Sequence, residues 1–75
     1  MNRDKLLGII KGKGLTVYEV IDDVEKQGVS MSSSTFYKGL NDKRPFKANE
    51  ILALANALNL TKDEVLDIFF TELVS

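Results

Sequence analysis

The sequence contains neither cysteine nor histidine among its 75 residues. Disulfide bonds and thiolate metal sites are therefore impossible, and the commonest metal ligand and general base is absent. A chain this short has little length for a catalytic cleft, so we expect no enzyme, no metal and no cofactor. No apolar run approaches the ~20 residues of a membrane span, and residues 1–5 lack the apolar core of a signal peptide. These absences favour a single cytoplasmic domain over residues 1–75.

A surplus of basic charge is also absent, because the net charge is −1. The charges are nevertheless unevenly distributed. Residues 1–14 and 32–47 each hold four basic side chains against one acid, whereas residues 15–31 hold one against four and residues 48–75 one against five. Distribution matters more than the sum for recognition. The two basic segments are therefore the candidates for contact with nucleic acid.

The sequence does contain a series of helical patterns. Apolar residues at helical spacing predict helices over residues 3–13, 17–27, 33–40, 48–58 and 62–70. Thr16 with Glu19, and Thr61 with Glu64, have the spacing of capping boxes, in which each side chain bonds the backbone N–H of the other residue. The second and fifth helices should therefore begin directly after Thr16 and Thr61.

Gly14 and Asn59 are predicted to take the left-handed conformation that ends a helix. In the fourth helix, the side chains expected to face inward are Ile51, Leu52, Leu54, Ala55 and Leu58. The tail 71–75 is expected to be flexible, or to form a strand-like arm that pairs with another copy. Five short helices without a convincing strand imply a compact all-α domain.

The third helix begins in a serine-rich stretch, residues 29–41. Ser32 is the predicted N-cap, and hydroxyl residues fill the first turn: Ser33, Ser34 and Thr35. Phe36 and Leu40 are four residues apart and can point inward together, which leaves Tyr37 and Lys38 on other faces. A helix with a small polar first turn and a basic flank suits a DNA groove, although such a cluster can also be an ordinary helix start.

Several short segments carry a further pattern: Gly14-Leu15-Thr16, Glu19-Val20-Ile21, Val29-Ser30, Ser34-Thr35-Phe36, Gly39-Leu40-Asn41, Arg44-Pro45 and residues 54–60. In this order they resemble the lambda-repressor/Cro-type helix-turn-helix family over most of residues 5–70. Residues 40–46 and 68–70 are more narrowly similar to small phage-encoded regulators of the Cro-like or modulator-of-repression type.

The resemblance implies a compact five-helix lambda-repressor-like bundle whose helix-turn-helix occupies about residues 16–41. It also implies a transcriptional regulator that binds operator DNA in a lysis–lysogeny switch, in the cytoplasm of a bacterial host. By position, the base-reading residues are Ser33, Ser34, Tyr37 and Lys38. The phosphate contacts are Asn41 and Lys43, with Thr16 and Arg44 as further candidates. A homodimer on two half-sites is expected.

A second interpretation makes a protein the partner. The family usually has glutamine at the first position of the second helix, where this chain has Val17, and the segment that follows is acidic. Such a chain could act as an antirepressor or co-repressor that binds the DNA-binding domain of a phage repressor. The side chains assigned to that contact are Glu19, Asp22, Asp23 and Glu25.

Overall fold

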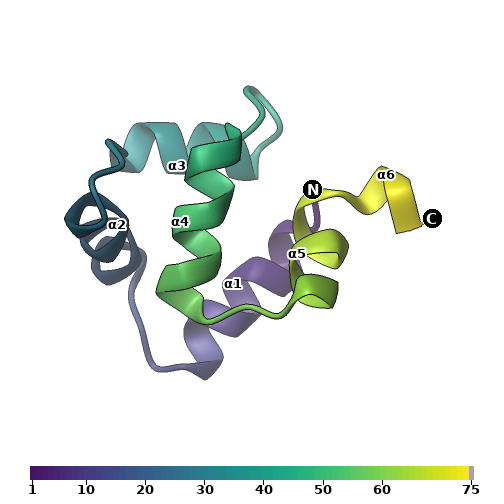
Figure 1. Ribbon diagram of the computed structural model, residues 1–75, viewed down its shortest axis with the longest axis horizontal. Coiled ribbons are helices and arrows are strands. Elements are labelled where there is room, and N and C mark those ends of the chain that lie inside the picture. Colours follow the sequence, from purple (N-terminus) through teal and green to yellow (C-terminus); the bar gives the residue numbers. More distant parts are fainter. Residues whose placement is uncertain (75) are drawn as a thin grey trace.

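The computed structural model describes residues 1–74, which fold into helices without any strand among them (Figure 1). The helices are α1 (Arg3–Gly12), α2 (Val17–Lys26), α3 (Ser33–Leu40), α4 (Ala48–Leu58), α5 (Lys62–Phe69) and the single turn α6 (Thr71–Val74). The predicted compact all-α fold is therefore confirmed, with its five helices in place. In these described residues no helix is long and apolar enough to cross a membrane.

The chain after α5 differs from one expectation for the tail. Residues 71–74 form the helical turn α6, so no strand-like arm is present there. The flexibility expected for residues 71–75 stays a prediction, and Ser75 lies outside the described residues.

Local hydrogen bonds set the helix starts that the sequence predicted. At α2, Thr16 Oγ1 accepts from the Glu19 N–H at 3.2 Å, and Glu19 Oε1 accepts from the Thr16 N–H at 3.0 Å. The same reciprocal pair opens α5, where Thr61 and Glu64 are joined at 3.1 and 2.8 Å. The left-handed residue that ends α4 is also as predicted, since Asn59 has a φ of +56°.

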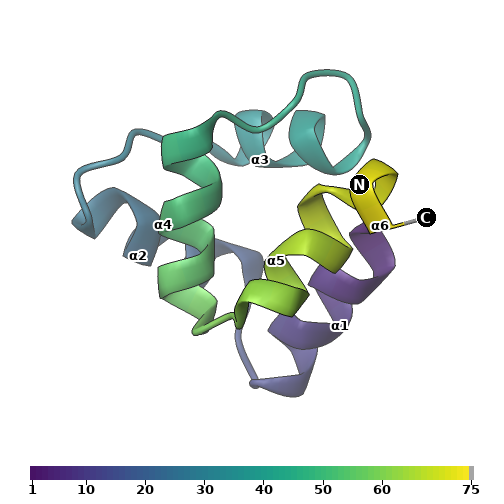
Figure 2. The ribbon, with the colours of Figure 1, turned by 45° about the vertical axis from the view of Figure 1, so that its right-hand side comes forward.

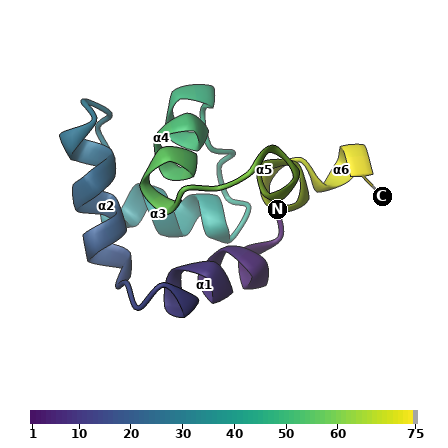
Figure 3. The ribbon, with the colours of Figure 1, turned by 60° about the horizontal axis from the view of Figure 1, so that its bottom comes forward.

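Figures 1 and 2 show α4 between α2 and α5. Helix α2 packs on α3 and α4, while α5 packs on α1 and α4. In Figure 3, α1 runs along the bottom of the view and α2 along its left-hand side. The core lies between these helices and consists of buried apolar side chains: Leu6, Ile10, Val20, Ile21, Val24, Met31, Phe36, Leu40, Ala53, Leu54, Leu58 and Ile68.

One inward residue of α4 was predicted wrongly. Leu52 is 66% exposed, whereas its neighbour Ala53 is buried and its carbonyl accepts from the Gln27 side chain at 2.9 Å. Successive residues of a helix are rotated by about 100°, so Leu52 lies nearly opposite Leu54. The core-facing row of α4 therefore runs through Ala53, Leu54 and Leu58.

An aromatic cluster joins α3 and the loop that follows it to α5. The Phe46 ring lies 6.0 Å from the Phe36 ring and 5.8 Å from the Phe69 ring, measured between centroids. Phe46 also lies against Gly39, where any Cβ would overlap its ring. A residue without a side chain is therefore required on this face of α3, because only glycine lets the loop fold back this closely.

Candidate nucleic-acid interface

The outer face of α3 carries four polar or aromatic side chains at positions i, i+3, i+4 and i+7: Ser34, Tyr37, Lys38 and Asn41. All four are exposed, and they form one stripe along the helix. The opposite face consists of Phe36, Gly39 and Leu40, all buried. Ser33, also predicted as a base-reading residue, is less exposed than these four and lies half-buried at the edge of the stripe. We call the four exposed residues the α3 stripe.

The hydroxyl groups at the start of α3 are divided between two uses. Ser32 Oγ accepts from the Thr35 N–H at 3.1 Å and bonds the Thr35 hydroxyl at 3.1 Å, so this pair caps the helix. By contrast, the Ser33 and Ser34 side chains make no hydrogen bond to any described residue. These two hydroxyls are therefore available to an external partner.

The loop after α3 is held in place by the backbone of its own helix. The N–H groups of Lys43 and Arg44 both donate to the Lys38 carbonyl, at 2.9 and 3.4 Å. Asp42 takes a left-handed φ of +56°, and its carboxylate accepts from the Met1 ammonium at 3.1 Å. Lys43 is exposed on this fixed loop. A cation is thus positioned next to the C-terminal end of the α3 stripe.

Arg44 has an internal partner that the sequence interpretation missed. Its guanidinium donates to both carboxylate oxygens of Glu50, at 3.2 and 2.8 Å, and Glu50 Oε1 also accepts from the Lys47 N–H at 2.7 Å. Glu50 is only 4% exposed. Arg44 therefore holds the loop against α4 through this internal ion pair. The available signal was an acid three residues into the fourth helix, the position of a capping glutamate.

The ion pair changes the pKa of both groups. Burial acts to raise the pKa of Glu50. The hydrogen bonds from Arg44 and from the Lys47 N–H act in the other direction, as do the positive charges of the Arg44 and Lys47 side chains. Together they outweigh burial and lower the pKa of Glu50. The hydrogen bond to Glu50 raises the pKa of Arg44. Both groups therefore stay charged at neutral pH, as a buried carboxylate with satisfied oxygens can.

Thr16 and the acids of α2 lie in a separate region. The Thr16 hydroxyl caps α2, although the residue is exposed. Of the acids, Glu19 bonds the Thr16 N–H, Asp22 pairs with Lys26 at 2.9 Å, and Asp23 accepts from Gln27 at 3.1 Å. All of these acids are exposed, as is the fourth, Glu25. The described residues include no group of three acids that could hold a metal ion.

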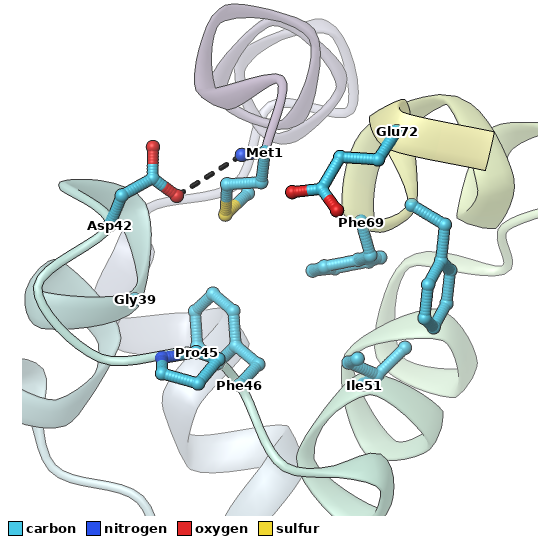
Figure 4. Close-up of a pocket in the computed structure, with 9 residues that line it drawn as sticks. Met1, Gly39, Asp42, Pro45, Phe46, Ile51, Phe69 and Glu72 are labelled. Atoms are coloured by element: carbon cyan, nitrogen blue, oxygen red, sulfur yellow. Dashed lines mark hydrogen bonds and ion pairs between the residues drawn. The ribbon is translucent and has the colours of Figure 1, made fainter. Parts of the chain in front are cut away.

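Two hollows lie away from the α3 stripe. One is a pocket of about 220 Å³ beneath the loop after α3, with the Phe46 and Phe69 rings and the Asp42 and Glu72 carboxylates on its walls (Figure 4). The other is an apolar groove of about 440 Å³ between α4 and α5, lined by Leu52, Leu60, Lys62, Val65 and Leu66. Neither contains any of the residues predicted to read bases.

Known proteins add no constraint to this geometry. No family model, no curated protein and no solved structure matches the chain. The functional interpretation therefore depends on the α3 stripe and the groups around it.

Proposed function

We propose that this chain is a transcriptional regulator that binds operator DNA, with α2 and α3 as a helix-turn-helix and α3 in the major groove. The observation that carries the proposal is the α3 stripe, a polar face opposite a fully buried one. An α-helix with its side chains is about 10–12 Å in diameter, and the major groove, about 12 Å wide, admits it.

The side chains of the α3 stripe, with Ser33 at its edge, fit direct contact with bases. Ser33 and Ser34 are small, so the first turn of α3 can approach the base edges closely, and their hydroxyls can donate or accept. Tyr37 and Lys38 reach further, and Lys38 can donate to guanine or to a phosphate. Serine specifies bases weakly by itself, so Lys38 is expected to carry most of the discrimination.

The loop after α3 supports the phosphate contacts. Asn41 and Lys43 are exposed at the end of the stripe, and phosphate contacts of this kind fix the register of a protein on DNA. Arg44 acts as a positioning residue in this proposal, because its guanidinium is bonded to Glu50. Thr16 remains a candidate phosphate contact at the exposed start of α2.

The resemblance to the lambda-repressor/Cro-type family adds a biological role to the proposal. It supports a phage-encoded regulator of a lysis–lysogeny switch. A module of this size buries only a small area on DNA, so a dimer on two half-sites is proposed as the binding form.

The test is an electrophoretic mobility shift with duplexes from either side of the protein's own coding sequence. The wild type should form a specific complex at low salt that weakens steeply as salt rises. Lys38→Glu should lower the affinity at least about tenfold, because it replaces a contact with a repulsion. Lys62→Glu is the matched control, since Lys62 is an exposed lysine at the start of α5.

Two results would contradict the proposal. One is the absence of any specific complex at low salt. The other is an equal loss of affinity in Lys38→Glu and Lys62→Glu, because both variants change the net charge identically and only one changes the α3 stripe.

A second candidate function is binding to a repressor protein, favoured by the exposed acids of α2: Glu19, Asp22, Asp23 and Glu25. They would face the basic DNA-binding surface of that repressor. Three of the four are already bonded within α2 or its cap, which makes this the weaker candidate. Co-purification with the neighbouring repressor, and a change in repressor–DNA affinity with this protein in excess, would support it. An unchanged affinity would argue against it.

A further inference from the structure

The beginning of α1 lies beside the end of α3. Arg3 Nη1 donates to Asn41 Oδ1 at 2.7 Å, a contact between residues 38 positions apart in the sequence. The views in Figures 1, 2 and 3 all place the N-terminus next to the loop that follows α3. The Asn2 N–H fixes this end of the chain by donating to the Ile68 carbonyl at 2.7 Å.

Within the described part of the chain, Arg3 makes no ion pair. Asp42, the acid of the loop after α3, is paired with the Met1 ammonium. Both Arg3 and Asn41 are exposed. A guanidinium has five N–H donors in a planar fork, and the bond to Asn41 uses only one of its two terminal nitrogens.

The bond also orients Asn41. Its Oδ1 accepts from Arg3, so its amide NH₂ group must point elsewhere and remains a donor. Asn41 is the last member of the α3 stripe, one turn after Lys38. Two sets of N–H donors, from the guanidinium and from the amide, are thus held side by side where the stripe ends.

We propose that Arg3 and Asn41 bind one DNA backbone phosphate together, and that Arg3 is a phosphate-contacting residue of the interface. The inference depends on the proposed function, since α3 must enter the groove for this phosphate to be in reach. Arg3 supplies the charge and the fork that matches phosphate oxygens, while Asn41 supplies a neutral donor that Arg3 holds in place. The interface then spans α1 as well as α3 and its loop.

The experiment measures the salt dependence of binding to one defined duplex by fluorescence anisotropy. A phosphate contact contributes about 0.9 to the slope of log affinity against log salt. The affinity advantage of the wild type over Arg3→Gln should therefore shrink about threefold between about 50 and about 200 mM salt. Lys62→Gln removes the same charge far from α3 and should keep the wild-type slope.

A double variant tests the joint site. Asn41→Ala should weaken binding, and adding it to Arg3→Gln should cost less than it does in the wild type, because both residues serve one phosphate. Circular dichroism checks that each variant is folded. Exposure of both side chains makes unfolding an unexpected result.

The outcomes separate this inference from the proposed function. If the wild type binds with a steep slope and Arg3→Gln has the slope of Lys62→Gln, the Arg3 contact is wrong and the regulator proposal stands. If the two single variants are additive, they do not share a phosphate. If the wild type binds no duplex even at low salt, both proposals fail.

Discussion

The two faces of α3 differ in burial and in chemistry. Phe36 is completely buried, while Tyr37, the next residue, is 44% exposed, and the two rings meet edge to face at 5.7 Å. One face joins the core and the aromatic cluster, and the other faces solvent with side chains that can bind. The residues that stabilise the fold and those proposed to bind DNA are therefore only one position apart along one short helix.

The largest effect is expected on the buried face of α3. Phe36→Ala should destabilise the fold by about 3–5 kcal/mol, because it leaves a cavity where the ring packs. Small domains are stable by about 5–15 kcal/mol, so much of the margin would be lost. Tyr37→Ala should cost far less stability and instead lower the DNA affinity. Urea unfolding and anisotropy measure the two effects, and equal destabilisation by both variants would contradict the separation.

The next effect concerns the ion pair between Arg44 and Glu50, which holds the loop after α3 against α4. Glu50→Gln should cost about 2 kcal/mol, because it leaves the Arg44 guanidinium without its carboxylate. Glu64→Gln is the matched control, since Glu64 caps α5 in the same way but has no arginine partner, and glutamine also serves in a capping box. Urea unfolding at neutral pH compares them, and similar losses in both variants would show that the ion pair contributes little.

The same pair predicts a pH dependence. The folded-state pKa of Glu50 is lowered from its ordinary value of 4.5, so its contribution is complete above that value and is lost as the pH falls through the lower folded-state pKa. The stability difference between wild type and Glu50→Gln should therefore be constant near neutrality and shrink below pH 4.5. Unfolding curves from neutral to acidic pH would measure this stability difference. A stability difference that grows on acidification would contradict the prediction.

The smallest effects are expected at two helical glycines, Gly39 and Gly8. Gly39→Ala should cost about 1–2 kcal/mol, because the new methyl group would overlap the Phe46 ring, which Phe36 and Phe69 hold in place. Gly8→Ala has open space around it and should instead stabilise α1 by up to about 1 kcal/mol. Thermal unfolding should give opposite signs. A gain in both variants would show that Phe46 moves aside easily.

Sequence reasoning succeeded where structure depends on neighbours along the chain. The bounds predicted for the fourth helix, 48–58, match α4, and the boxes at Thr16 and Thr61 open α2 and α5 as expected. It failed at Leu52, where a broad run of apolar residues hid which row faces the core. The sequence also did not reveal Glu50 as a partner of Arg44, which the resemblance makes a candidate phosphate contact, because the shape of the loop decides whether these two side chains meet.

Sequence patterns predicted the ends of α1 to α5 to within one residue and the apolar face of α3, because caps and helical spacing act over three or four residues. They did not predict the turn α6. Three contacts depend on the packing of the helices: Arg44 bonds Glu50, Phe46 requires glycine at position 39, and Arg3 lies beside Asn41. Those contacts join residues on different elements. They depend on how the helices pack, which no local pattern encodes.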